Sequence, residues 1–192
     1  PLKDCRSRPA PHVERFCQST GADVVLKALG WRRIGLDGAM QIVVQQIVHA
    51  PRALTFAIAC DIGGWPDLMS GIEKIEMLTR EPVVAGTRFR ETRRMHGRVS
   101  AEEMAVAEIN PPEHFVLTGE SHGARYRIDH VFEDVPEGTR MTLMFAATPL
   151  TMSARLMSPL ALMFRAALLR QIKADLDDVK TVIEARFARN DD

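Results

Sequence analysis

The sequence has few cysteines, few aromatic residues and no long apolar run. Its 192 residues include three cysteines, Cys5, Cys17 and Cys60, and their spacing matches no metal-binding pattern. An odd number of cysteines without a secretory segment favours a reduced protein, so we expect a cytoplasmic location. No apolar run approaches the roughly 18 to 20 residues of a transmembrane helix, so we expect no integral membrane segment.

The sequence also lacks an excess of charge of either sign. Lysine plus arginine and aspartate plus glutamate number 25 each, which provides no electrostatic reason to expect a nucleic-acid partner. No two of the six histidines have the spacing of a ligand pair, and no glycine-rich phosphate loop, nucleophile elbow or Cys/His dyad occurs. We therefore expect neither a metal site nor a cofactor.

Residues 1–39 differ from the rest of the chain because they contain none of the ten methionines. Met40 begins a β-branched, strand-like run. Residues 1–39 are therefore either a native leader or a segment foreign to the natural protein. We expect residues 1–39 to form an N-terminal extension that is either non-native or disordered, and residues 40–192 to form one folded domain.

The clearest periodic signal lies near the end of the chain, from Ser158 to Phe187. Apolar residues recur there every three or four positions, which predicts a long amphipathic helix about 45 Å in length. Ser158 and Pro159 suit its first turn. Room is left beside the apolar stripe by Ala161, Ala166 and Ala167. The stripe carries no candidate catalytic group, so we expect any chemistry to come from the sheet. The stripe consists of Leu160, Met163, Phe164, Ala167, Leu168, Ile172, Leu176, Val179, Ile183 and Phe187.

Seven strand-like runs separated by turn residues precede this helix. Their short spacing is typical of antiparallel hairpins. Two short helices are expected between the first two strands, at 51–59 and 67–71. The predicted strands are 40–49, 72–79, 87–98, 101–109, 114–122, 125–134 and 139–148.

The alternation of apolar and polar residues predicts how these strands pair. A turn at Gly123-Ala124 sets Phe115 opposite Phe132, and a loop over 135–138 sets Phe132 opposite Met141. Carried back through a turn at Val99-Ser100, the same alternation sets Glu91 opposite Glu108. An outward row of arginines either pairs with nearby glutamates or meets an anionic partner; it consists of Arg88, Arg90, Arg94 and Arg98.

The order of these elements is accompanied by several short motifs. They are Ile47-Val-His-Ala-Pro51, Asp61 with Trp65-Pro66, Gly86-Thr-Arg-Phe-Arg, Gly138-Thr-Arg and the helix from Leu168 to Glu184. Together they resemble the START-like, or SRPBCC, superfamily, in particular its polyketide cyclase/dehydrase and lipid-transport branch, with coenzyme Q-binding proteins as relatives. The resemblance implies an α+β helix-grip fold, in which a seven-stranded antiparallel sheet curls around the last helix. It also implies a cavity between sheet and helix that holds an apolar or aromatic ligand.

Few polar residues are predicted to point into such a cavity. Glu91 and Glu108 would raise each other's pKa and suit general acid or base catalysis. The plainer interpretation is that Arg93 holds both carboxylates in a structural ion cluster. His130 and Tyr126 could hydrogen-bond a ligand or transfer a proton, although a buried histidine is more often bonded to a backbone carbonyl or a water.

The remaining residues predicted to surround a ligand are mostly apolar. Trp65 follows two glycines in a loop that would border the cavity, either as a lid or as ordinary packing. The numerous methionines suit an adaptable lining or simple core filling. The predicted ligand-binding residues are Trp65, Arg93, Met95, Met104, Val106, Leu117, Ile128, Phe132, Leu143, Phe145, Met163 and Ala167.

Two functions remain open from the sequence. The first is a carrier or binding module for a hydrophobic small molecule such as a lipid, a quinone or a polyketide. The second is a polyketide cyclase or dehydratase that uses the inward residues His130, Tyr126, Glu91 and Glu108 for acid/base catalysis. The leucine- and methionine-rich stretch at 150–162 could also dock on a membrane or another protein.

Overall fold

A computed structural model describes residues 40–190 apart from 81, 96, 122 and 152–157. The chain divides into two compact units, Pro1–Asp37 and Gly38–Asp192, and the described residues all belong to the second. Most of the stretch at 150–162 that was considered for docking lies outside the described side chains. None of the described helices is both long and apolar enough to cross a membrane.

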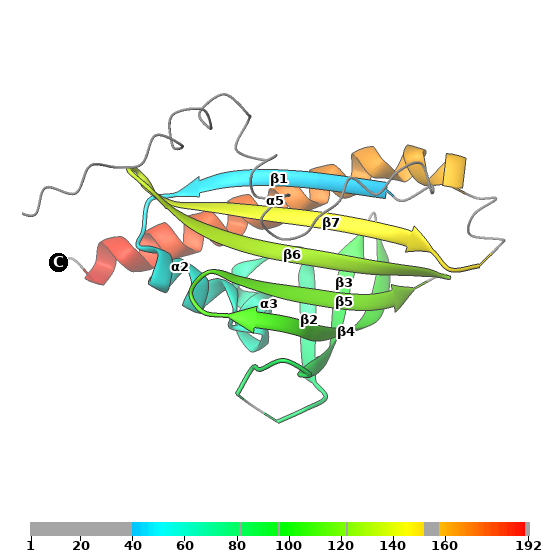
Figure 1. Cartoon of the computed structure of the whole chain (residues 1–192), viewed down its shortest axis with the longest axis horizontal. Helices are drawn as coiled ribbons and strands as arrows, with labels where there is room; N and C mark the ends of the chain where they lie inside the picture. Colours follow the sequence, from blue (N-terminus) through cyan, green and yellow to red (C-terminus); the bar gives the residue numbers. More distant parts are fainter. Residues whose placement is uncertain (1–39, 81, 96, 122, 152–157, 191–192) are drawn as a thin grey trace, which may run out of the picture. The chain divides into compact units, whose positions relative to one another are not determined.

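The second unit contains seven strands and a long final helix, in the predicted order (Figure 1). The strands are β1 (Met40–Val48), β2 (Ile72–Met77), β3 (Arg88–Met95), β4 (Arg98–Asn110), β5 (His114–Ser121), β6 (Ala124–Val135) and β7 (Gly138–Pro149). The helices are α2 (Arg52–Ala59), the 3-10 turn η1 (Ile62–Gly64), α3 (Trp65–Leu68) and α5 (Ser158–Asn190).

All seven strands form one antiparallel sheet in the order β1-β7-β6-β5-β4-β3-β2. The sheet curls around α5, while α2 and α3 lie at one end of the concave side (Figure 1). Four residues of the predicted stripe, Ile172, Leu176, Val179 and Ile183, are buried against the sheet. The helix-grip fold expected from the sequence is confirmed.

The hairpin between β6 and β7 has the predicted register. Phe132 pairs with Met141 and His130 pairs with Leu143, so apolar groups from both strands share the concave face. Between β5 and β6 the prediction was wrong by two residues, because Phe115 pairs with His130 and not with Phe132. Ser121 pairs with Ala124, and Gly123 occupies the turn with a φ of 75°. An even shift leaves every side chain on its predicted face.

The hairpin between β3 and β4 differs more from the prediction. Met95 pairs with Arg98, and Gly97, with a φ of 78°, lies in the turn that was expected at Val99-Ser100. Glu91 therefore lies opposite Glu102 and not opposite Glu108. The shift arises because a glycine readily adopts the positive φ that a two-residue hairpin turn requires.

An irregularity in β4 corrects the prediction for Glu108 itself. The pairing with β5 shifts between Val106 and Glu108, which is a β-bulge. One extra residue in a strand reverses the alternation beyond it, so Glu108 points away from the concave side. There its carboxylate accepts a hydrogen bond of 3.1 Å from Arg127.

Three of the four outward arginines, Arg88, Arg90 and Arg94, pair with glutamates, which was one of the two interpretations of the sequence. Arg88 and Arg90 both contact Glu103, at 3.1 and 2.6 Å, and Arg94 contacts Glu73 at 2.6 Å. These pairs are solvent-exposed, so each contributes little to stability. They lie on the convex side of the sheet, opposite the concave side that lines the cavity.

Candidate functional site

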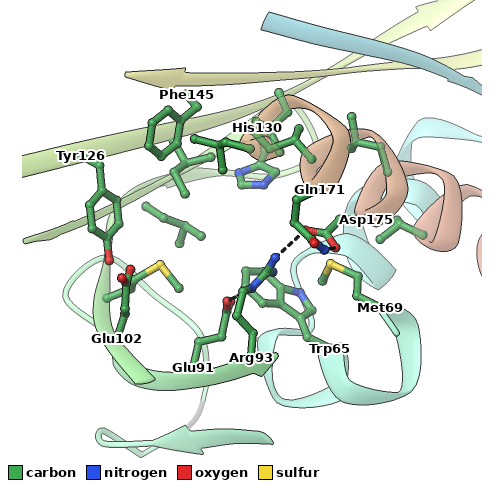
Figure 2. Close-up of a pocket in the computed structure, with 18 of the residues that line it drawn as sticks. Trp65, Met69, Glu91, Arg93, Glu102, Tyr126, His130, Phe145, Gln171 and Asp175 are labelled. Carbon is green, nitrogen blue, oxygen red and sulfur yellow. Dashed lines mark hydrogen bonds and ion pairs between the residues drawn. The ribbon is translucent and has the colours of Figure 1, made fainter. Parts of the chain in front are cut away.

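A cavity of about 370 Å³ lies between the concave face of the sheet and α5 (Figure 2). The inward alternation of the strands places most of the predicted residues on its wall. The predicted residues that line it are Trp65, Glu91, Arg93, Met104, Leu117, Tyr126, Ile128, His130, Leu143 and Phe145.

Several predicted residues do not line the cavity. Glu108 is on the opposite face because of the bulge, while Val106 and Phe132 are 1% exposed and belong to the solid core. Phe132 packs edge-on against Phe56, with ring centroids 5.4 Å apart. Ala167 lies one position away from Leu168, which lines the cavity in its place. The side chains of Met95 and Met163 lie outside the described residues.

The sequence prediction missed polar residues that α5 and β4 supply. Gln171 and Asp175 of α5 line the cavity, and neither was among the predicted site residues. Their positions lie one turn apart beside the apolar stripe, and this i,i+4 spacing was the available signal. Glu102 of β4 was also missing from the predicted site residues, although it shares the alternation of Met104 and lies opposite Glu91.

A buried ion cluster joins β3 to α5. Arg93 Nε donates to Glu91 Oε1 over 2.5 Å, and Arg93 Nη1 donates to Asp175 Oδ2 over 2.9 Å. The amide of Gln171 donates to the other oxygen of Asp175 over 2.9 Å. Figure 2 shows this chain of contacts crossing one end of the cavity. Arg93 was predicted to hold Glu91 and Glu108; the structure shows the contact with Glu91, but the second carboxylate is Asp175 and not Glu108.

The electrostatic environment of Glu91 opposes its ionisation. Burial raises the pKa of Glu91, Arg93 opposes this effect, and the nearby Asp175 and Glu102 raise the pKa further. The carboxyl group thus holds its proton to a higher pH than an exposed glutamate does.

The hydroxyl group of Tyr126 is buried close to the Glu102 carboxylate and makes no hydrogen bond of good geometry with any of the described residues. The side chain is 7% exposed and points toward Glu102 (Figure 2). Its ring stacks on Phe145, with centroids 6.2 Å apart. Burial raises the pKa of Tyr126 well above its usual value, and the carboxylates of Glu102 and Glu91 add to this effect.

His130 is a neutral imidazole on the same strand as Tyr126, and its side chain lies on the same face of the sheet. Burial lowers the pKa of His130 to about 3. Its Nδ1 atom is buried and has no partner in the described part of the chain, and its ring stacks on Phe115 with centroids 4.2 Å apart. Buried polar atoms are normally hydrogen-bonded, so two such atoms in one cavity favour a ligand or water that reaches them.

Trp65 and Cys60 both lie in the packed hydrophobic core. The indole of Trp65 donates to the carbonyl oxygen of Ala59 over 3.0 Å, and its ring packs edge-on against Phe89. These contacts favour the packing interpretation of Trp65 over a lid. Burial raises the pKa of Cys60 to about 11, so it is a poor nucleophile. The described residues contain no cluster of three acidic, histidine or cysteine side chains that could hold a metal ion.

Comparison with known proteins agrees with this geometry. A family model described as polyketide cyclase / dehydrase and lipid transport matches residues 40–184. No curated protein sequence matches the chain.

Several solved structures share the fold. The TTHA0849 protein from Thermus thermophilus is 19% identical over 77% of this chain and 99% of its own, with a TM-score of 0.63. The Zhui aromatase/cyclase from Streptomyces sp. R1128 is 16% identical over 77% of this chain and 95% of its own, also with a TM-score of 0.63. Major latex-like protein 151 from Panax ginseng is 9% identical over 74% of this chain and 96% of its own, with a TM-score of 0.61. At these identities the likeness establishes the fold alone.

Proposed function

The chain belongs to the polyketide cyclase/dehydrase and lipid transport family, and we propose that it binds a small hydrophobic molecule in its cavity as a carrier or binding module. The observation that carries this proposal is the cavity itself. Its volume of about 370 Å³ falls within the roughly 300–1,000 Å³ of small-molecule sites.

The residues around the cavity support an apolar ligand. Ile128, Phe145 and Ala147 point into it from the centre of the sheet, yet their side chains remain half-buried and not fully packed. Protein interiors are normally close-packed, because a void deprives its lining of contacts. An apolar molecule would supply these contacts and remove the lining from water.

A second candidate is the acid/base enzyme that the sequence left open, and the raised pKa of Glu91 favours it. A general acid or base works best when its pKa lies near the working pH. His130, with a pKa of about 3, is then a weak base, and Tyr126 is a weak acid. Glu91 is the strongest remaining candidate, but Arg93 already engages its carboxylate. Binding is therefore the better-supported function.

The first test is to look for a bound molecule and to measure binding of a neutral probe. Native mass spectrometry of the purified protein is expected to reveal a co-purified small molecule. Isothermal titration with 2-(2-naphthyl)ethanol is expected to show saturable binding at one site. Failure of both measurements would contradict the proposal.

A pair of variants locates the site. Ala147→Phe places a ring in the cavity and is expected to weaken binding of the probe at least tenfold. Thr148→Phe, one residue away on the exposed side, is the matched control and is expected to bind as the native protein does. Equal binding by both variants would place the probe elsewhere.

The enzyme candidate has its own test. A co-purified molecule, once identified, is incubated with native protein and with the His130→Ala and Glu91→Gln variants. Recovery of the unchanged molecule in every case would contradict catalysis. The cytoplasmic location and the separate character of residues 1–39 remain predictions from the sequence.

A further inference from the structure

One end of the cavity carries more negative than positive charge. Three carboxylates and one guanidinium group line it. The carboxylates belong to Glu91, Glu102 and Asp175, and the guanidinium group belongs to Arg93. This guanidinium is already committed, because it contacts Glu91 at 2.5 Å and Asp175 at 2.9 Å. Among the described residues, no cation lies within ion-pair distance of Glu102. The Glu102 carboxylate is therefore a negative charge without a counterion in this part of the structure.

The hydroxyl group of Tyr126 lies beside this uncompensated carboxylate. It is buried, makes no hydrogen bond of good geometry with the described residues and points into the same end of the cavity (Figure 2). A phenolic oxygen can accept a hydrogen bond as well as donate one. A donor placed between Tyr126 and Glu102 would thus satisfy both groups.

We propose that the ligand carries a protonated amine, which donates hydrogen bonds to the Glu102 carboxylate and the Tyr126 oxygen while its apolar body lies against Ile128, Leu143 and Phe145. This inference rests on the proposed binding function and adds the chemical class of the ligand.

The charge of the site favours this class over the two alternatives. A carboxylate ligand would meet Glu91, Glu102 and Asp175 with only one arginine, and that arginine is occupied. A neutral alcohol could bond to Tyr126, but it would displace water from Glu102 without supplying a counterion. Glu102 is half-buried, and a ligand that covers it would take its charge out of water. A charge removed from water is stable only when it is paired and hydrogen-bonded, so an ammonium group is the best match.

The aromatic residues at this end also favour a cation. The rings of Tyr126 and Phe145 both line the cavity and stack with an interplanar angle of 17°. The faces of aromatic rings attract ammonium groups, most strongly where water is excluded. Two aromatic rings beside a carboxylate that has no cationic partner among the described residues form a site that suits an organic amine.

The test compares three probes of the same size and shape: 2-(2-naphthyl)ethylamine, 2-(2-naphthyl)ethanol and 2-naphthylacetate. Dissociation constants are measured by isothermal titration at pH 7 with the full chain. The amine is expected to bind at least tenfold more tightly than the alcohol, and the carboxylate is expected to bind more weakly than the alcohol. An amine that binds no more tightly than the alcohol would overturn the inference while leaving the proposed function intact. Absence of binding by all three would overturn both.

Two neighbouring glutamates provide matched variants. Glu102→Gln is expected to remove most of the advantage of the amine, so that the dissociation constants of the amine and the alcohol measured on this variant differ by less than about threefold. Glu103→Gln is the control, because Glu103 lies on the opposite face and contacts Arg88 and Arg90. An equal loss of amine binding in both variants would contradict a role for Glu102. Thermal unfolding of each variant checks that the fold is retained.

Discussion

Glu91 on β3 lies directly opposite Glu102 on β4, so two carboxylates enter the cavity from neighbouring strands. Only Glu91 has an arginine partner, and it is the more buried of the two. This pairing gives the cavity its negative character, and it makes the stability of the protein depend on pH in a direction that can be measured.

The first prediction concerns the pH dependence due to Glu91. Because its pKa is raised in the folded state above the usual 4.5, folded protein binds its proton more tightly than unfolded protein does. The contribution of Glu91 to stability is therefore full below pH 4.5 and declines as pH rises through the raised value. The free energy of unfolding of native protein, relative to Glu91→Gln, is expected to fall between pH 4 and pH 8 in urea titrations. A difference that stays constant with pH would contradict the raised pKa.

The second prediction compares two adjacent arginines. Arg93→Met leaves Glu91 and Asp175 buried without a counterion and is expected to cost about 3–5 kcal/mol of unfolding free energy. Arg94→Met breaks only the exposed pair with Glu73 and is expected to cost about 0–1 kcal/mol. Guanidinium denaturation measures both. Similar losses in the two variants would show that the cluster around Arg93 contributes no more than a surface pair.

The third prediction uses the fact that Tyr126 is the single tyrosine of the chain. The absorbance of tyrosinate near 295 nm therefore reports this residue alone. In native protein it is expected to appear only well above pH 10, because burial and the neighbouring carboxylates raise the pKa of Tyr126. In guanidinium-unfolded protein the same change is expected near pH 10. Coincident titrations would show that the hydroxyl is exposed to water.

The fourth prediction tests the close approach of Gly119 to the tyrosine ring. A Cβ atom on Gly119 would overlap the hydroxyl end of Tyr126, which cannot move without displacing its ring. Gly119→Ala is therefore expected to cost about 1–3 kcal/mol of unfolding free energy. In a Tyr126→Leu background the same change is expected to cost less, because the overlapping ring is gone. Equal costs in both backgrounds would assign the loss to the strand and not to Tyr126.

The fifth prediction concerns acid stability at the junction of β1 and α5. Desolvation raises the pKa of Glu184, but hydrogen bonds from Lys180 and from the His49 backbone and ring outweigh it and lower the pKa to about 2. The donor atoms lie 2.6 to 2.8 Å from the carboxylate. Stability from Glu184 is thus present above pH 4.5 and lost as pH falls toward 2.

The matching variant is Glu184→Gln. It is expected to lower the free energy of unfolding at pH 7 by about 1 kcal/mol, because solvent screens the partly exposed carboxylate, and the difference from native protein is expected to shrink as the pH is lowered to 3. Glu137→Gln, at an exposed position, serves as the control. A difference that persists unchanged at pH 3 would contradict the lowered pKa.

Much of the cavity wall could be predicted from the sequence because a strand has a side-chain period of two. Tyr126, Ile128 and His130 alternate along one strand, so they reach the same face whatever the neighbouring strand does. A shift of two residues between β5 and β6 changed their partners without changing this face. The failure at Glu108 has the opposite cause, because a single extra residue in β4 reversed the alternation.

The sequence by itself determined the order of the strands and helices, the inward face of most strands and the apolar stripe of the last helix. These features depend on local periodicity, which each segment carries within itself. Only the tertiary structure decided the polar chemistry of the cavity. The pairing of Glu91 with Glu102 depends on which residues form a turn, and the contact of Arg93 with Asp175 joins positions 82 residues apart. No local pattern specifies such contacts, because they exist only once the sheet has curled around α5.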